Sequence, residues 1–115
     1  MANTFKVVTK AGVTSADVIY TVASSTTTVI LGLIIGNTTS SSVNATVTLG
    51  SDTGNRAGAN NESNQDVELI TSTPIPGNST LELLAGNKVV METTDTLSVT
   101  GSGAVDVALS VMEIT

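Results

Sequence analysis

The stretch Val43-Asn44-Ala45-Thr46-Val47-Thr48-Leu49 decides the fold class, because apolar and polar residues alternate along it without a break. Successive side chains of a β-strand point to opposite faces of the sheet, so this alternation predicts a strand with one buried face and one face in solvent. The same period of two is present in 80–83, 96–100 and 105–111. No segment combines a helical period with capping residues, so we expect essentially no helix.

The composition around this stretch is that of an all-β protein. Val, Ile and Thr account for 42 of the 115 residues, and β-branched side chains fit a pleated sheet better than a helix. Turns are predicted where Gly, Pro, Asn and small residues gather, notably at Ala11-Gly12, Pro74-Ile75-Pro76-Gly77-Asn78 and Ala85-Gly86-Asn87. Together these signals predict nine strands, at about 4–10, 17–23, 27–36, 43–50, 66–72, 79–84, 87–92, 95–100 and 104–114.

Two segments depart from simple alternation. The run Val29-Ile30-Leu31-Gly32-Leu33-Ile34-Ile35 is expected to be a central strand covered on both faces. In the last strand the apolar residues change phase after Val111, to Met112 and Ile114 around Glu113, and a β-bulge or a strand buried on both faces explains such a change. The whole chain of 115 residues is expected to form one antiparallel β-sandwich of eight to nine strands, jelly-roll or immunoglobulin-like.

The residue types that the sequence lacks restrict its chemistry. It has no Cys, His or Trp, and Phe5 and Tyr20 are its only aromatic residues. A disulfide, a thiol nucleophile, a Cys-ligated metal and a histidine base are thereby excluded. The net charge of -6 with four cationic residues is incompatible with the basic surface that nucleic acid requires. The longest apolar run has seven residues, where a spanning helix needs about 20. We expect no enzyme activity, no cofactor, and no membrane or nucleic-acid partner.

The acidic residues offer two weak candidates for chemistry. Asp52 with Glu62, or Asp66 with Glu68, could serve as the acid and base of a glycosidase. Solvated charges in a loop and on a strand edge are the favoured explanation, since the chain lacks the aromatic residues of a sugar subsite. Asp52-Thr53-Gly54-Asn55 also resembles an oxygen-rich calcium loop, although the EF-hand pattern is not met because its third position holds glycine. An Asx turn accounts for the same residues. No catalytic or metal-binding residue is therefore assigned.

Residues 51–65 read SDTGNRAGANNESNQ and contain no Val, Ile, Leu or aromatic residue. We expect a long polar loop there, and loops of this length in compact domains are usually functional or disordered. A partner could order such a loop on binding. The candidate contact residues in it are Asp52, Asn55, Arg56, Asn60, Asn61 and Glu62.

Charged residues that would protect sheet edges from pairing are scarce, since the chain has only four cationic residues for nine expected strands. Uncharged Thr and Ser faces with unprotected edges suit packing against copies of the same chain or against another protein. We therefore expect self-association, as a dimer or a trimer, rather than a monomer.

Three further segments stand out, namely Met1-Ala2-Asn3-Thr4-Phe5-Lys6, IYTVASSTTTVILG at 19–32, and LELLAGNKVV at 81–90 leading to LSVMEI at 109–114. They resemble small virion structural proteins of tailed bacteriophages, of the marine phage and cyanophage type. The resemblance covers nearly the whole chain apart from 51–65. It consists of short segments typical of strands and turns rather than a chemical motif. It implies a β-sandwich without enzymatic activity, made in the host cytoplasm and present in many copies in the virion.

The resemblance leads us to expect a capsid decoration or cement protein, which binds outside the shell and bridges neighbouring capsid subunits. A tail subunit of the neck, baseplate or fibre is the main alternative, so that the partners are capsid or tail proteins. A lectin-like or calcium-binding module is a further alternative, which the shortage of aromatic residues disfavours. The expected contact elements are the 51–65 loop and the N-terminal residues Ala2, Asn3, Thr4, Phe5 and Lys6.

Overall fold

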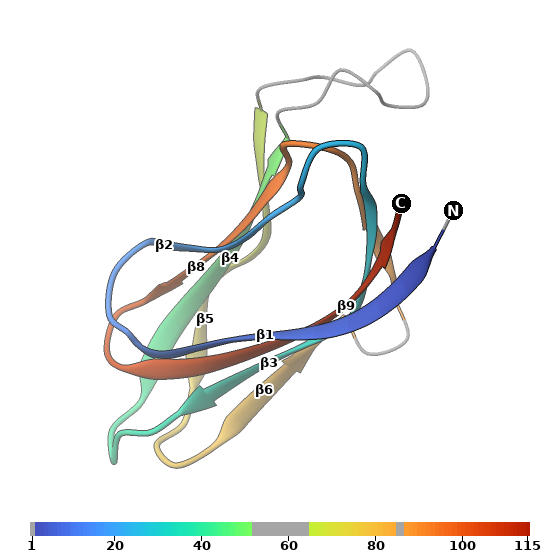
Figure 1. Cartoon of the computed structure of the whole chain (residues 1–115). Helices are drawn as coiled ribbons and strands as arrows, with labels where there is room; N and C mark the ends of the chain where they lie inside the picture. Colours follow the sequence, from blue (N-terminus) through green and yellow to red (C-terminus); the bar gives the residue numbers. More distant parts are fainter. Residues whose placement is uncertain (1, 52–64, 85–86) are drawn as a thin grey trace.

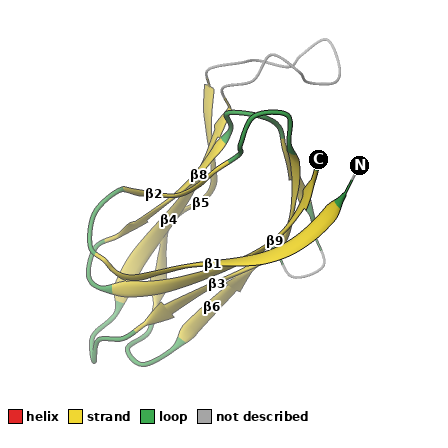
Figure 2. Cartoon of the chain, viewed as in Figure 1, coloured by secondary structure: helices red, strands yellow, loops and turns green. Residues whose placement is uncertain are grey.

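Nine strands and no helix make up the part of the chain that this computed structural model describes, residues 2–51, 65–84 and 87–115 (Figure 1, Figure 2). No helix long and apolar enough to cross a membrane is therefore present in these ranges. The strands are β1 (Asn3–Val13), β2 (Asp17–Thr21), β3 (Thr27–Asn37), β4 (Val43–Ser51), β5 (Gln65–Ile75), β6 (Thr80–Leu83), β7 (Val89–Met91), β8 (Thr96–Gly101) and β9 (Val105–Ile114). They follow the nine predicted segments closely.

The strands form two sheets in which every pairing is antiparallel. The five-stranded sheet has the order β1-β9-β3-β6, with β7 also pairing with β3, and the four-stranded sheet has the order β2-β8-β4-β5. Figure 1 shows the two layers, with both ends of the chain lying together at one end of the molecule. The predicted all-β antiparallel sandwich is thereby confirmed.

The core lies between the two sheets and is built by alternate residues of each strand. In β4, Val43, Ala45 and Val47 are buried, whereas Asn44 between them is exposed. Burying a Val, Leu or Ile side chain contributes about 1.5–3 kcal/mol to folding. The buried apolar residues are Val13, Val22, Ile30, Leu33, Ile35, Val43, Ala45, Val47, Ile75, Met91, Leu97, Val99, Val105, Val107, Leu109 and Val111.

Asn37 holds the turns at one end of the sandwich. Its side chain is buried, and its Nδ2 donates to the carbonyl oxygens of Ser41 at 2.8 Å and Ile75 at 2.9 Å. Its Oδ1 accepts a hydrogen bond of 2.9 Å from the backbone nitrogen of Thr39. One side chain thus ties the turn that follows β3 to the end of β5.

β1 extends beyond the end that the turn residues predicted. It continues through Ala11-Gly12 to Val13, with a register shift between Lys10 and Val13. Gly12 has a φ of 68° and donates its N–H to Asp106 Oδ1 at 2.9 Å. The glycine therefore makes an irregularity within the strand rather than its end.

β5 also extends further than predicted, through Pro74 to Ile75. Pro74 opposes Asn44 of β4, and β5 is an edge strand. A proline is tolerated there because the missing N–H need not serve a neighbouring strand. The hairpin predicted at Ala85-Gly86-Asn87 includes two residues that lie outside the described ranges.

β3 is central, as predicted, but only its inner face is covered. It lies between β9 on one side and β6 and β7 on the other. Ile30, Leu33 and Ile35 are buried, whereas Ile34 is 46% exposed. The expectation that Val29–Ile35 is covered on both faces is therefore wrong. The run lacks alternation because its outward residues are apolar as well.

The irregularity expected in the last strand is found in β3 instead. The register shift between β3 and β9 falls between Ile30 and Gly32, so the additional residue belongs to β3. β9 keeps one phase, because Val111 is buried and Glu113 points to the same side, toward Tyr20 of the other sheet. The change of pattern in the sequence marks a charged residue at an inward position rather than a bulge.

Candidate assembly surfaces

One outer face of the sandwich is apolar. It belongs to the five-stranded sheet, where outward residues of neighbouring strands lie side by side. Phe5 of β1 pairs with Met112 of β9, Met112 pairs with Val29 of β3, and Val29 pairs with Val90 of β7. Phe5 is 70% exposed and Val90 is 53% exposed. An apolar row therefore runs across the whole width of this sheet.

Two further rows extend this surface along the strands. Val7 of β1, 64% exposed, pairs with Ser110 of β9. Ile34 of β3 pairs with Ala108 of β9 on one side and with Glu82 of β6 on the other. Glu82 is the charged residue of these rows, and it lies at the edge of the sheet. We call this surface the apolar face; its large side chains are Phe5, Val7, Val29, Ile34, Val90 and Met112.

The outer face of the four-stranded sheet is polar instead. Thr46 pairs with Thr100, and Thr48 pairs with Ser98, across β4 and β8. The large apolar residue on this face is Val18 of β2, which pairs with Ser98. We call this surface the Thr/Ser face; its hydroxyl residues are Thr21, Thr46, Thr48, Thr96, Ser98 and Thr100.

The acidic residues singled out in the sequence give no site in the described ranges. Asp66 and Glu68 point outward on the edge strand β5 and share a face. Thr71 Oγ1 donates to Glu68 Oε1 at 2.6 Å. No group of three or more His, Cys, Asp or Glu residues that could hold a metal is found among the described residues. Asp52 and Glu62 lie outside them.

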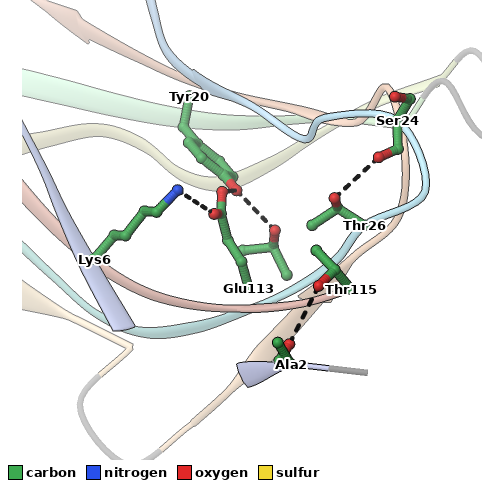
Figure 3. Close-up of polar contacts among 8 residues, drawn as sticks. Ala2, Lys6, Tyr20, Ser24, Thr26, Glu113 and Thr115 are labelled. Atoms are coloured by element: carbon green, nitrogen blue, oxygen red, sulfur yellow. Dashed lines mark hydrogen bonds and ion pairs between the residues drawn. The ribbon is translucent and has the colours of Figure 1, made fainter. Parts of the chain in front are cut away.

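A polar cluster joins the two sheets near the chain ends (Figure 3). Tyr20 of β2 donates its hydroxyl proton to Glu113 Oε2 of β9 at 2.6 Å. Lys6 Nζ of β1 lies 2.7 Å from Glu113 Oε1. Thr28 Oγ1 of β3 lies 2.8 Å from the Tyr20 oxygen, and because the tyrosine proton goes to the carboxylate, Thr28 is the donor. One strand of the four-stranded sheet is thereby tied to three strands of the other.

These contacts shift the pKa values of both acidic groups. Burial raises the pKa of Tyr20 to about 12, and the hydrogen bond to Glu113 adds to the effect. The hydrogen bond from Lys6 lowers the pKa of Glu113, and the bond from Tyr20 lowers it further. The Glu113 side chain is 14% exposed, and two donors compensate its charge. At neutral pH the cluster therefore combines a carboxylate, an ammonium and a neutral phenol, and it fastens β1 and β2 to the sandwich.

The predicted N-terminal contact residues fall on both sides of β1. Asn3 and Phe5 point outward, and Phe5 belongs to the apolar face. Thr4 and Lys6 point inward, where Lys6 is held in the polar cluster. Ala2 exchanges backbone hydrogen bonds with the last residue of the chain. Of the five residues, Phe5 is thus the one that offers a large apolar side chain to a partner.

The predicted loop residues cannot be placed in the same way, since Asp52, Asn55, Arg56, Asn60, Asn61 and Glu62 lie outside the described residues. The sequence analysis missed most of the apolar face, namely Val7, Val29, Ile34, Val90 and Met112. The available signal was the run Val29–Ile35, in which both sides of one strand are apolar. The register that sets the other residues beside it is long-range and leaves no local trace.

Comparison with known proteins assigns no family. No family model and no curated protein matches this chain. One similar solved structure comes from Bacillus endospore appendages, described as a novel family of disulfide-linked pili. The similarity covers 99% of this chain and 87% of that chain, with 13% identity and a TM-score of 0.48. A likeness of this degree carries no argument about function.

Proposed function

We propose that this chain is a non-enzymatic structural protein of a tailed-phage virion, a decoration protein that binds outside the capsid shell in many copies. The observation that supports this most is the apolar face. It holds four of the six large hydrophobic side chains that are exposed in the described residues. Contiguous exposed apolar surface of this kind marks an interaction site.

Docking of this face would remove apolar surface from water. Phe5 is 70% exposed and Val7 is 64% exposed, and fully burying a side chain of this size contributes about 1.5–3 kcal/mol. Association itself costs translational and rotational freedom, so a single contact of this size is weak. Many copies that bridge neighbouring subunits of one lattice stabilise the assembled shell together.

The distribution of charge suits such docking. The net charge is -6, yet the central rows of the apolar face hold no charged side chain, and Glu82 and Asp106 stand at their margin. Burying the central rows of this face therefore takes no charge out of water, and an unpaired buried charge would cost several kcal/mol. The Thr/Ser face then remains in solvent.

Copy number in purified particles tests the proposal. Quantitative mass spectrometry would compare this protein with the major capsid protein. We expect a ratio near that of the capsid protein itself, because a decoration protein follows the lattice. A ratio of a few per cent would contradict decoration and would fit a subunit of the neck, baseplate or fibre. Absence from the particle would overturn a virion role altogether.

A matched pair of variants tests the surface. Val90→Lys places a charge on the apolar face, and Thr21→Lys places the same charge on the Thr/Ser face. We expect Val90→Lys to weaken rebinding to shells stripped of this protein by at least about tenfold, since a buried unpaired charge costs more than the ~1.4 kcal/mol that tenfold represents. Thr21→Lys is expected to bind within about twofold of the parent. Equal losses for both variants would contradict the assignment of the face.

The 51–65 loop is the second expected contact. Deleting residues 53–63 is expected to keep the fold, because the buried core residues lie in the strands on either side, and to weaken particle binding. Unchanged binding by the shortened protein would remove the loop from the interface and leave the apolar face as its main part.

A further inference from the structure

The outer edge of β1 presents a defined set of backbone groups. Ala2 and Thr115 exchange N–H···O bonds of 3.1 and 3.0 Å, so they form a hydrogen-bonded pair of the β1–β9 ladder. Such pairs alternate with non-bonded pairs in an antiparallel ladder. The residues whose N–H and C=O point away from β9 are consequently Asn3, Phe5, Val7 and Thr9. β1 is the terminal strand of its sheet among those described.

The other long edge of the sandwich is protected against pairing. β5 has 11 residues at an edge, but it contains Pro74, a positive φ of 45° at Ser72, and two register shifts against β4. Prolines and bulges of this kind hinder pairing with another strand. β2, β6 and β7 have only 5, 4 and 3 residues. In the described ranges, β1 is thus the edge with a long regular stretch, residues 3–10.

The two lysines of β1 point inward and are already paired. Lys6 Nζ lies 2.7 Å from Glu113 Oε1, and Lys10 Nζ lies 3.6 Å from Asp17 Oδ2. Lysine on an edge strand ordinarily discourages pairing with a further strand. Here a carboxylate of the same chain compensates each charge, and the outward residues of 3–9 are uncharged.

We propose that β1 pairs with β1 of a second copy, antiparallel about a two-fold axis that passes through Val7. A two-fold axis pairs a surface with itself, so the edge groups of both copies are satisfied reciprocally. In this register Phe5 opposes the partner subunit's Thr9, and Lys6 opposes the partner subunit's Val8. An axis through Lys6 would set two lysines directly opposite each other, which is unfavourable.

The same pairing joins the two apolar faces, and this continuity favours a second copy over an unrelated strand. A two-fold axis perpendicular to the sheet keeps both outer faces on the same side. Phe5 and Val7 of the two copies then meet, and one apolar band crosses two five-stranded sheets. The inference goes beyond the proposed function, since it concerns the protein on its own and holds if the chain belongs to another assembly.

Sedimentation velocity of the full chain, from about 1 to 500 μM, tests the inference. We expect a dimer that forms with rising concentration. Val7→Pro removes an edge N–H without removing a β1–β9 bond, and is expected to weaken the dimer at least tenfold. Val7→Thr keeps that N–H and loses only apolar contact, so it is expected to weaken the dimer clearly less than Val7→Pro does. Val90→Lys, on the apolar face but away from this edge, is expected to dimerise normally.

Disulfide cross-linking gives a second readout, which still holds if circular dichroism shows that Val7→Pro does not fold. The chain has no Cys, so Val7→Cys places one thiol per copy on the proposed axis, where paired Cα atoms lie about 5.5 Å apart, within disulfide range. Rapid oxidation to a dimer is expected. Val90→Cys is the control, since Val90 is 53% exposed against 64% for Val7, and it is expected to cross-link only at the rate of random collisions.

Three outcomes would overturn the pairing. These are a monomer at every concentration, equal cross-linking of the two cysteine variants, and a dimer that Val90→Lys abolishes but Val7→Pro does not. The last result would place the contact on the apolar face. Binding to shells by a protein that stays monomeric would refute this pairing and leave the proposed function standing.

Discussion

The two outer faces of this sandwich differ, although the strands beneath them obey the same alternation. On the four-stranded sheet the outward positions of β4 and β8 hold mainly Thr and Ser, together with Asn44 and Gly50. On the five-stranded sheet the outward positions include Phe5, Val7 and Ile34, all of them exposed. Folding requires one apolar side per sheet, which both sheets already provide to the core. A second apolar side on one sheet therefore answers a requirement other than folding, and assembly is the one we infer.

The inward and outward residues of β3 give the clearest comparison of a buried side with the apolar face. The largest expected effect on stability comes from changing its inward residue. Ile35 is fully buried, whereas its neighbour Ile34 is 46% exposed on the apolar face. We expect Ile35→Ala to lower the free energy of unfolding by about 2–5 kcal/mol, because it leaves a cavity in the core. Ile34→Ala is expected to cost less than about 1 kcal/mol, since its exposed surface gains little from folding. Urea unfolding measures both, and equal losses would show that the apolar face belongs to the folding core.

The polar cluster that joins the two sheets gives the next largest effect. Glu113→Gln removes the ion pair with Lys6 and weakens the bond from Tyr20, and we expect it to cost about 1–3 kcal/mol. The pKa of Glu113 is lowered in the folded protein, so its contribution is present above its unfolded pKa, about 4.3, and is lost as the pH falls below that value. The difference in free energy of unfolding between Glu113→Gln and the parent should therefore become smaller at acidic pH.

Glu82→Gln is the matched control for this experiment, because Glu82 is an exposed glutamate of the same sheet. We expect it to change the free energy of unfolding by less than about 0.5 kcal/mol. A loss as large as that of Glu113→Gln would mean that the effect reflects overall charge rather than the contacts between the sheets.

A pH titration of Tyr20, the member of the polar cluster that lies on the four-stranded sheet, tests the same contacts. Tyr20 is the single tyrosine and the chain has no Trp, so the ultraviolet absorbance of tyrosinate reports this one residue. We expect a midpoint at about 12 in the folded protein against about 10 in the unfolded chain. This contribution to stability is complete below the unfolded pKa and is lost as the pH rises through the folded one. A folded midpoint near the ordinary value, or no decrease in Glu113→Gln, would contradict the geometry of the cluster.

The sequence predicted the inner sides of the strands well and the outer surfaces poorly, for a physical reason. Alternation such as that of Val43–Leu49 is local, because it concerns which side of one strand meets the core. The row from Phe5 to Val90 depends instead on register between distant strands, which no local pattern encodes. The same holds for Tyr20 and Glu113, which lie 93 residues apart. Glu113 was even misleading, because a charged residue at an inward position has the pattern of a phase change.

A small effect on stability, but a clear effect on association, is expected from making the Thr/Ser face resemble the apolar face. Ser98 pairs with Val18 on one side and with Thr48 on the other, so Ser98→Val combined with Thr48→Val would create an apolar row across three strands. β-branched residues suit strands, and we expect the free energy of unfolding to change by less than about 1 kcal/mol.

Self-association of the double variant should nevertheless increase, because a second contiguous apolar surface becomes exposed. Sedimentation against concentration measures this, with Thr48→Ser as the control that keeps the row polar. If the double variant associates no more than the parent, an apolar row on an outer face is not sufficient to form a contact, and the inference from the apolar face to assembly then depends on the edge of β1 rather than on the face itself.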